Sequence, residues 1–344
     1  MKAAVLQNYN ADLSIETVAD PECPTNGVVL DVLACGVCRS DYHGWVGHHP
    51  KVTPGDIMGH EYCGVVTEAG PEATHKVGDR LIAPFILGCG TCASCQTGAS
   101  NTCGNQLTPG FGMPGAYAQR IAVPFDHNLV PLPDSIDPKL AAGLGCRVTT
   151  AWHALTDRAN VRIGEWVAIH GTGGIGLSAL LLAKMLGARV IVVDIVEDKL
   201  NHARSLGADM SINATKENVA EAIMDATNGG ADVSIEALGI EQTTNASVEC
   251  LRVSGRHVHL GMPAGDGHMS INMRAIYAKQ LSFYGSRGMP SWKYPTLLDM
   301  IESGRVDLSP LVTRTIDLRM ASDELCAMKG ETAPGTAVIT DFDV

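Results

Sequence analysis

The sequence lacks a long apolar run and an export signal, and both absences restrict where the protein can act. No stretch approaches the roughly 18 to 20 consecutive apolar residues that a transmembrane helix needs, so we expect no membrane partner. The N-terminal residues alternate polar and apolar types and lack the uninterrupted apolar core of a signal peptide. We therefore expect the mature chain to begin with a strand at Met1 and to remain in the cytoplasm.

Positive charge is also scarce, since 25 Lys and Arg face 37 Asp and Glu and the formal net charge is −12. No basic run is long enough to track a phosphate backbone, which excludes nucleic acid as an expected partner. Cysteine, in contrast, is plentiful at 11 residues. Because cytoplasmic thiols stay reduced, these cysteines indicate metal ligands or free thiols rather than a disulfide framework.

A chain of 344 residues is too long for one ordinary core and suits two domains. In residues 1–150, Gly and Pro separate short β-type runs, which is typical of an irregular, mostly β domain. In residues 151–285, short apolar runs alternate with stretches of helical periodicity, which predicts βαβ units and a parallel sheet. Residues 286–344 end in an apolar run, TAVITDF, that could return to the first domain.

A glycine-rich turn, GTGGIG, lies between the apolar run VAIH and a helical stretch. Gly171, Gly173 and Gly176 allow a tight turn and a close approach of the backbone to a pyrophosphate at the helix N-terminus. Asp194 ends the next apolar run, 23 residues after Gly171. A carboxylate there accepts hydrogen bonds from a ribose and repels a 2′-phosphate, so the pattern predicts NAD rather than NADP. The alternative is a glycine-rich turn that binds nothing.

Four cysteines form a second motif, CxxCxxCx7C, made of Cys89, Cys92, Cys95 and Cys103. Four thiolates complete the tetrahedral coordination of zinc and leave no open position, so the predicted site is structural. An iron–sulfur cluster or four free thiols are the alternatives. A zinc ribbon for nucleic acid would have two CxxC pairs on a basic module, unlike this segment.

Several motifs occur in one order: CGVCRSDYH at residues 35–43, Gly59-His60-Glu61, the four cysteines, Gly145-Cys146 and the glycine-rich turn. This ordered set, which covers nearly the whole chain, resembles the zinc-dependent alcohol dehydrogenases of the medium-chain dehydrogenase/reductase family. The resemblance implies an α/β fold: a GroES-like, mainly β catalytic domain (1–150, completed by 286–344) and a Rossmann domain with a doubly wound parallel sheet (151–285). The chain resembles the short microbial members, which are often tetramers, more than the longer dimeric animal forms, so the resemblance also implies a homotetramer.

The resemblance further implies a catalytic zinc held by Cys38, His60 and Cys146, with Glu61 as a neighbouring carboxylate. Three protein ligands leave a fourth position open for water or a substrate oxygen. Asp41 matches an acceptor that orients the His60 ring. With the structural site this makes two zinc ions per chain. Taken singly, Cys146 could be a buried small hydrophobe and His60 a core histidine.

Two residues of the opening motif match a proton relay. Oxidation of an alcohol requires the hydroxyl proton to leave, and zinc stabilises the resulting alkoxide. In the resembling enzymes the proton passes through the hydroxyl that matches Ser40, then through the cofactor ribose, to the imidazole that matches His43. Histidine suits the outer end because its pKa lies near the operating pH. We therefore expect Ser40 and His43 to be catalytic.

Four more residues match cofactor contacts: Arg39 to the pyrophosphate, Thr150 and Ile175 to the nicotinamide, and Lys199 to the adenosine ribose. Solvated side chains are the alternative for Arg39 and Lys199. Phe85 and Trp45 are expected to line the substrate pocket, with plain core residues as the alternative.

The chain departs from the family at Thr336, where many relatives carry an arginine that touches the pyrophosphate. We expect either weaker cofactor binding or compensation by another residue such as Arg287. Tyr42 and the run GHHP at residues 47–50 match no pattern with a known function.

The expected reaction is reversible, NAD-dependent oxidation of a primary or secondary alcohol to an aldehyde or ketone. A polyol or aldehyde-adduct dehydrogenase of the same family is an alternative, although polyol enzymes tend to have glutamate where this chain has Cys146. A zinc-free quinone or enoyl reductase would not need Cys38, His60 or the four cysteines. A non-enzymatic NAD-binding protein would not need Ser40 and His43.

Overall fold

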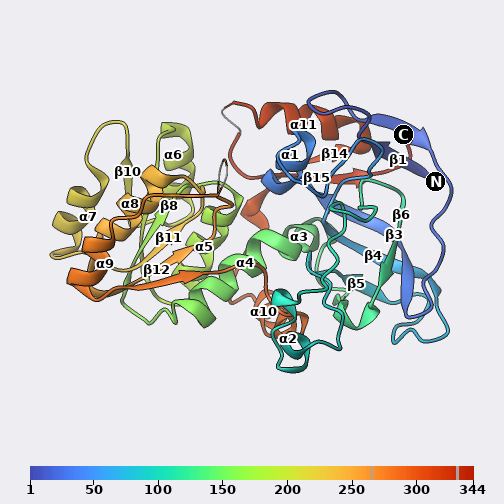
Figure 1. Cartoon of the computed structure of the whole chain (residues 1–344), viewed down its shortest axis with the longest axis horizontal. Coiled ribbons are helices and arrows are strands. Elements are labelled where there is room, and N and C mark those ends of the chain that lie inside the picture. Colours follow the sequence, from blue (N-terminus) through green and yellow to red (C-terminus); the bar gives the residue numbers. More distant parts are fainter. Residues whose placement is uncertain (264, 266, 331–332) are drawn as a thin grey trace.

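The computed structural model describes residues 1–263, 265, 267–330 and 333–344. Two large sheets lie side by side, and both chain termini lie at the outer end of one of them (Figure 1). One sheet is built from the first part of the chain and the tail, and the other from the middle. The two sheets thus draw on the same parts of the chain as the two expected domains, whose bounds near residues 150 and 285 stay a prediction.

The first sheet has the strand order β14-β15-β3-β4-β5-β7, with β6 paired to β3. Its strands are β3 (Gly27–Gly36), β4 (Glu61–Ala69), β5 (Arg80–Ile82), β6 (Arg120–Pro124), β7 (Val130–Pro131), β14 (Val312–Asp317) and β15 (Thr336–Asp341). A separate antiparallel pair is formed by β1 (Lys2–Val5) and β2 (Ser14–Thr17). The helices of this part are α1 (Arg39–Trp45), α2 (Ala93–Gln96), α10 (Tyr294–Glu302) and α11 (Ala321–Ala327).

The apolar run near the C-terminus does return to the first sheet. Strand β15 pairs antiparallel with β3, so that Val338 lies opposite Gly36 and Ile339 opposite Cys35. Both tail side chains are fully buried. The tail therefore packs beside the end of β3, from which the chain passes directly to Cys38.

The second sheet has six strands in the order β10-β9-β8-β11-β12-β13, and all of its pairs are parallel. Its strands are β8 (Trp166–His170), β9 (Arg189–Asp194), β10 (Met210–Asn213), β11 (Ala231–Glu236), β12 (Leu251–His259) and β13 (Ser282–Gly285). Its helices are α5 (Gly174–Met185), α6 (Glu197–Ser205), α7 (Val219–Thr227), α8 (Glu241–Glu249) and α9 (Met273–Lys279). The winding direction reverses between β8 and β11, and ligands bind outside the carboxyl ends of strands at such a point. The predicted α/β fold with a parallel, doubly wound sheet is confirmed.

One helical segment connects the two parts. It consists of α3 (Pro138–Gly143), a π-helical turn (Leu144–Val148), α4 (Thr149–His153) and a second π-helical turn (Ala154–Arg158). The Asp137 side chain caps its start by accepting a 2.9 Å hydrogen bond from the Lys139 backbone. The segment lies between the two sheets in Figure 1 and carries both Cys146 and Thr150.

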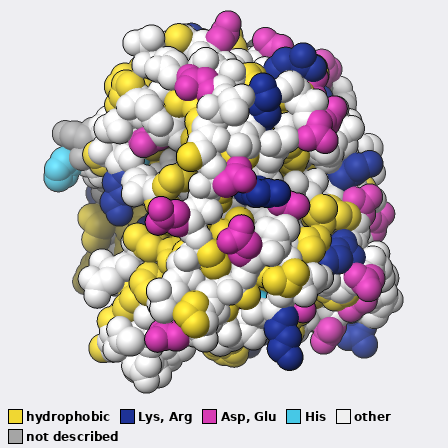
Figure 2. Space-filling model, turned by 90° about the vertical axis from the view of Figure 1, so that its right-hand side faces the viewer, with side chains coloured by type: hydrophobic (Ala, Val, Ile, Leu, Met, Phe, Trp, Pro, Cys, Tyr) yellow, Lys and Arg dark blue, Asp and Glu magenta, His cyan; other side chains and the backbone are white. Residues whose placement is uncertain are grey.

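Surface charges alternate in sign on the end of the molecule that Figure 2 shows, where basic side chains lie among acidic ones. Within the described residues, no helix combines the length and the apolar character that crossing a membrane requires.

Two histidines are buried in the parallel sheet, and this makes a prediction about acid stability. Burial lowers the pKa of His170 and of His257 to about 3 each. Between about pH 6.5 and pH 3 the unfolded chain binds these protons and the native chain does not. The unfolding free energy should therefore fall with falling pH, by about 1.4 kcal/mol per pH unit for each histidine.

The measurement is urea unfolding from pH 7 to pH 4.5 for the wild type and His257→Gln. The variant should lose one histidine's share of the pH slope, whereas His48→Asn, at an exposed position, should keep the full slope. An unchanged slope in His257→Gln would contradict the assignment.

Candidate metal centres and the cavity between the two sheets

A cavity of about 1970 Å³ is lined by both parts of the chain. Residues of α1 and the connecting helix line one side, and the glycine-rich turn after β8 lines the other. The sequence-predicted residues along it are Cys38, Arg39, Ser40, His43, His60, Phe85, Cys146, Thr150, Gly171, Gly173, Ile175, Asp194 and Lys199. The structure therefore brings nearly all of the predicted cofactor and catalytic residues to one cavity.

The first group of possible metal ligands, here the mixed cluster, consists of Cys38, His60, Glu61 and Cys146. Cys38 precedes α1, His60 and Glu61 stand at the start of β4, and Cys146 lies on the first π-helical turn. All four residues are buried, and one ligand atom from each lies within 4.8 Å of the others. Three distant chain segments thus converge on one small volume.

The His60 ring is oriented from behind by Asp41. Nδ1 of His60 lies 2.8 Å from Oδ1 of Asp41, and both side chains are buried. The other ring nitrogen, Nε2, is buried and has no hydrogen-bond partner among the described residues. A buried polar atom left without a partner is costly, and a metal ion on this side would satisfy it.

The sulfur atoms of the mixed cluster also suit a metal. A hydrogen bond from Cys146 holds the pKa of Cys38 well below its ordinary value, although burial opposes this. A thiolate is the form that coordinates a metal. Two sulfurs and one imidazole nitrogen in a buried site match the donor set of a zinc ion with an open fourth position.

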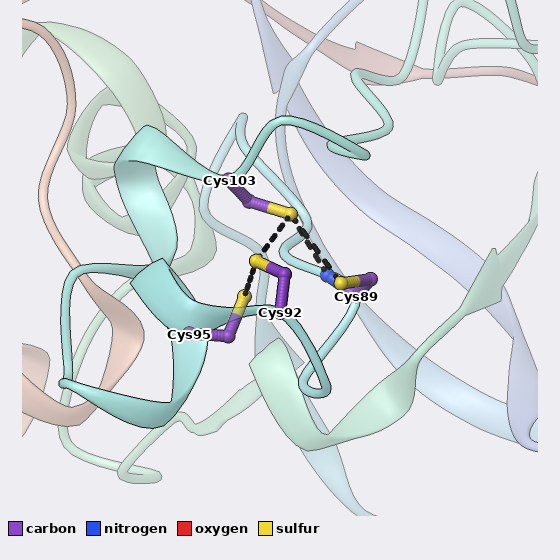
Figure 3. Close-up of side chains that lie close together, drawn as sticks. All are labelled: Cys89, Cys92, Cys95 and Cys103. Atoms are coloured by element: carbon purple, nitrogen blue, oxygen red, sulfur yellow. Dashed lines mark hydrogen bonds between the residues drawn. The ribbon is translucent and has the colours of Figure 1, made fainter.

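The four-cysteine cluster, Cys89, Cys92, Cys95 and Cys103, has its sulfur atoms facing one another (Figure 3). Consecutive sulfur separations are 3.5 Å for Cys92 and Cys95, 3.6 Å for Cys92 and Cys103, and 3.5 Å for Cys103 and Cys89. A zinc tetrahedron with bonds of about 2.3 Å places its sulfurs about 3.8 Å apart. Hydrogen bonds from the Thr91 backbone lower the pKa of Cys89 to about 5. The spacing and the acidic thiol both fit a closed zinc site.

Ser40 and His43 lie on α1 beside the mixed cluster. The hydroxyl oxygen of Ser40 is 3.9 Å from the sulfur of Cys38. Nδ1 of His43 is buried without a hydrogen-bond partner in the described part of the chain. Burial, assisted by Arg39, lowers the pKa of His43, so the ring is neutral at pH 7 and can accept a proton.

The glycine-rich turn has the close packing that only glycine permits. Gly171 has φ of +97°, and a Cβ on Gly176 would lie 1.8 Å from the Gly171 carbonyl oxygen. The Asp194 carboxylate accepts hydrogen bonds from the backbone and hydroxyl of Thr172 at 2.9 and 2.6 Å. These contacts hold the carboxylate at the carboxyl end of β9, on the wall of the cavity.

Trp45 corrects one sequence prediction. Its indole N–H donates a 2.6 Å hydrogen bond to the Ala11 carbonyl, and the residue is only 1% exposed. It is not among the described residues that line the cavity, so it is a core residue rather than a wall of the substrate pocket. Phe85, in contrast, does line the cavity. Tyr42, which had no interpretation, supports Arg39, whose guanidinium lies 4.4 Å from the centre of its ring.

Arg147 is a site residue that sequence reasoning missed. Its backbone N–H and its Nε donate to the Glu61 carboxylate at 3.1 and 3.0 Å, and a terminal nitrogen forms an ion pair with the same group. Its other terminal nitrogen donates to the Thr336 hydroxyl. Arg147 therefore contacts Thr336, the position at which many of the resembling enzymes carry an arginine, and whether Arg287 compensates for that arginine stays a prediction. The signal in the sequence was a charged residue within a run of small and apolar residues, since a buried charge requires a partner.

The same side chain lies against the glycine-rich turn. A Cβ on Gly174 would lie 2.4 Å from Cδ of Arg147. Burial raises the pKa of Glu61 to about 7, and Arg147 opposes the rise. Arg147 thus links the mixed cluster to the start of α5.

Comparison with known proteins gives two family matches. Residues 24–134 match the alcohol dehydrogenase GroES-like domain, and residues 174–303 match the zinc-binding dehydrogenase domain. An alcohol dehydrogenase of Geobacillus stearothermophilus is 36% identical over 77% of this chain and 78% of its own. An L-threonine 3-dehydrogenase of Rhizobium etli strain CIAT 652 is 31% identical over 96% of this chain and 95% of its own. The solved alcohol dehydrogenase from Thermus sp. ATN1 is 29% identical, with a TM-score of 0.91 over 99% of this chain and 100% of that one.

The buried ion pair predicts a large loss of stability when only one partner is removed. Arg147→Met should lower the unfolding free energy by about 3 to 5 kcal/mol, because buried Glu61 would lose its counterion and its side-chain hydrogen-bond donors and would have to bind a proton to stay buried. The measurement is urea unfolding in the presence of zinc. The double variant Arg147→Met with Glu61→Gln is the control and should recover most of the loss. A single-variant loss below about 1 kcal/mol would mean that the carboxylate does not depend on Arg147.

Proposed function

Because the chain belongs to the zinc-dependent alcohol dehydrogenase family, we propose that it transfers a hydride from a primary or secondary alcohol to NAD, reversibly giving an aldehyde or ketone. The observation that carries this proposal is that the mixed cluster, Ser40, His43 and the nucleotide turn all border one cavity. A carbinol carbon must lie between a metal and a nicotinamide for this reaction, and one cavity that reaches both supports that arrangement.

We propose two zinc ions per chain. Cys38, His60 and Cys146 would hold the catalytic ion, with Glu61 beside it, and Cys89, Cys92, Cys95 and Cys103 would hold the structural one. Zinc at the first site would act as a Lewis acid toward the alcohol oxygen. The four-cysteine segment has few buried apolar side chains of its own, so a closed metal site would fix its shape.

The chain's own residues would carry the proton away. The Ser40 hydroxyl can accept a proton from the alcohol and donate its own onward, because a hydroxyl is both donor and acceptor. His43, with its lowered pKa, is a neutral acceptor at pH 7 at the outer end of the relay. Asp41 would keep the His60 ring in the tautomer that ligates through Nε2.

Cofactor contacts follow from the lining of the cavity. Gly171, Gly173 and Gly176 would admit the pyrophosphate, Arg39 would pair with it, and Thr150 and Ile175 would contact the nicotinamide. Asp194 and Lys199 would bind the adenosine ribose. The Asp194 carboxylate favours NAD because it would repel a 2′-phosphate.

Two further proposals concern the protein in the cell. We propose a homotetramer, since strand β13 is an edge of the parallel sheet and Tyr277 and Phe283 near it are 85% and 38% exposed. We also propose a cytoplasmic location, because eleven cysteines without a disulfide suit a reducing compartment.

The proposed function is tested by the initial rate of NADH formation with primary, secondary, aromatic and polyhydric alcohols, together with zinc content. We expect turnover and two zinc ions per chain. Cys146→Ser should lower turnover by about 100-fold or more and weaken zinc binding, because one of three ligands is lost. Cys326→Ser, an exposed cysteine outside both clusters, is the matched control. No turnover from a sample with two zinc ions would contradict the proposal.

Cofactor choice gives a separate prediction. Asp194→Asn removes the charge and retains the shape, so the preference for NAD over NADP in kcat/KM should fall by about 10- to 100-fold. Asp198→Asn, an exposed carboxylate four residues later, should leave the preference unchanged. Equal effects on both cofactors would show that Asp194 acts through the turn rather than through charge.

A further inference from the structure

The substrate side of the cavity carries three basic residues that the proposed reaction does not use: His49, Lys51 and Arg287. We refer to them as the basic group, and all three line the cavity. Burial lowers the pKa of His49, and the cations Arg287 and Lys51 lower it further, so the ring is neutral at pH 7 and the positive charge of the basic group rests on Arg287 and Lys51. Their position relative to the mixed cluster decides what they can bind.

Arg287 is held against the wall nearest the mixed cluster. Its backbone carbonyl accepts a 3.0 Å hydrogen bond from the Asn101 side chain, and the next N–H, of Gly288, donates to the Thr150 hydroxyl at 3.2 Å. Its guanidinium lies 5.4 Å from the centre of the Phe85 ring. The Phe85 ring in turn lies 6.0 Å from the His60 ring. Arg287 and His60 therefore both lie beside the Phe85 ring.

His49 approaches the mixed cluster from another side. Its ring lies 4.6 Å from the Phe111 ring, which lies 5.3 Å from His60. The Lys51 backbone N–H donates to Nδ1 of His49 at 3.3 Å, so the two residues form one tight turn. Phe85 and Phe111 thus both lie beside the His60 ring, with Arg287 close to the first and His49 close to the second.

No carboxylate balances this charge on the substrate side within the described chain. Four acidic residues line the cavity: Asp194, Glu217, Glu249 and Glu324. The first three belong to the parallel-sheet part, and Glu324 is paired with Arg314. Among the described residues, Arg287 and Lys51 form no ion pair, whereas Arg147 is paired with Glu61.

We propose that Arg287 binds an anionic group of the substrate, a carboxylate or a phosphate ester, so that the preferred substrates are hydroxy acids or hydroxyalkyl phosphates and their oxo counterparts. This inference rests on the proposed function. A guanidinium stacked on an aromatic face keeps its in-plane N–H groups free for two oxygens, which suits either anion. Lys51, on the same turn as His49, adds to the positive potential around the anion.

Binding of the anionic group leaves the proposed alcohol oxidation unchanged. The carbinol carbon loses a hydride to NAD, the hydroxyl proton leaves to solvent, and the carbon becomes a carbonyl carbon. The anionic group takes no part in bond making. Arg287 is therefore a specificity-determining residue, and its removal should affect anionic substrates alone.

The kinetic test compares hydroxy acids of increasing chain length with their methyl esters, and hydroxyalkyl phosphates with the parent diols. The wild type should prefer the anion in at least one pair by about 10-fold or more in kcat/KM. Which pair shows the preference distinguishes carboxylate from phosphate. In Arg287→Gln the preference should vanish while the neutral partner stays within about 3-fold. Arg305→Gln, an exposed arginine that does not line the cavity, is the matched control.

An equilibrium test uses calorimetric titration of the zinc-loaded enzyme saturated with NADH. Pentanoate, methyl phosphate or both should bind more tightly than the neutral pentanamide. Tighter binding of pentanoate indicates a carboxylate site, and tighter binding of methyl phosphate indicates a phosphate site. Arg287→Gln should abolish the difference between anion and amide. NADH affinity should be the same in the wild type and the variant. A weaker NADH affinity with equal losses for neutral and charged substrates would overturn the proposal, because Arg287 would then be a cofactor contact.

The two proposals fail in different ways. If neutral alcohols are oxidised but neither kinetics nor titration shows an anion preference that depends on Arg287, the anion site is wrong and the dehydrogenase function stands. If the anions bind through Arg287 and no alcohol is oxidised, the anion site stands and the proposed function is wrong.

Discussion

The buried ion pair between Glu61 and Arg147 is the interaction on which the geometry of the mixed cluster and of the glycine-rich turn depends. Two charges removed from water are tolerated only when hydrogen bonds replace their hydration, and this carboxylate receives contacts from both the backbone and the side chain of Arg147. The pair also explains glycines on both sides of it. A Cβ on Gly36 would lie 2.7 Å from the Glu61 carboxylate and 2.8 Å from the Arg147 guanidinium. The absence of a side chain at Gly36 and at Gly174 therefore lets β3 and α5 pack closely against this pair.

The first π-helical turn (Leu144–Val148) places two adjacent residues, Cys146 and Arg147, in different surroundings. Adjacent residues on a helix point about 100° apart, so Cys146 and Arg147 can face different neighbours. Cys146 joins the mixed cluster, whereas Arg147 reaches Glu61 and, through its terminal nitrogen, Thr336 on β15. Such turns occur frequently at functional sites because they change the direction of a side chain without ending the helix. The tail strand is thereby connected to the mixed cluster, although it lies far from those residues in sequence.

The parts of the site that could be predicted are those that depend on residue types close together in the sequence. Glycines at fixed spacing, followed by Asp194 at the end of a strand, predict a nucleotide-binding turn, and in the structure Gly171, Gly173 and Asp194 line the cavity. Trp45 was misassigned because an aromatic residue on a short helix looks the same in sequence whether it faces a pocket or a core. Arg147 was missed because its partner, Glu61, is 86 residues away and no local pattern joins them. The return of β15 to β3 was left open for the same reason, since strand pairing depends on contacts distant in sequence.

Charge is distributed unevenly between the surface and the pocket, and this has a consequence for specificity. The chain is acidic overall, with a net charge of −12, and acidic and basic side chains intermingle on the face in Figure 2. Against that background, unpaired basic residues beside the mixed cluster are costly, because a cation in a partly enclosed space loses hydration without gaining a counterion. Confinement lowers the pKa of Arg287, and the nearby Cys146 opposes the change. A bound anion would remove that cost and a neutral alcohol would not, so the free energy released by pairing would distinguish the two substrates before any step of the chemistry begins.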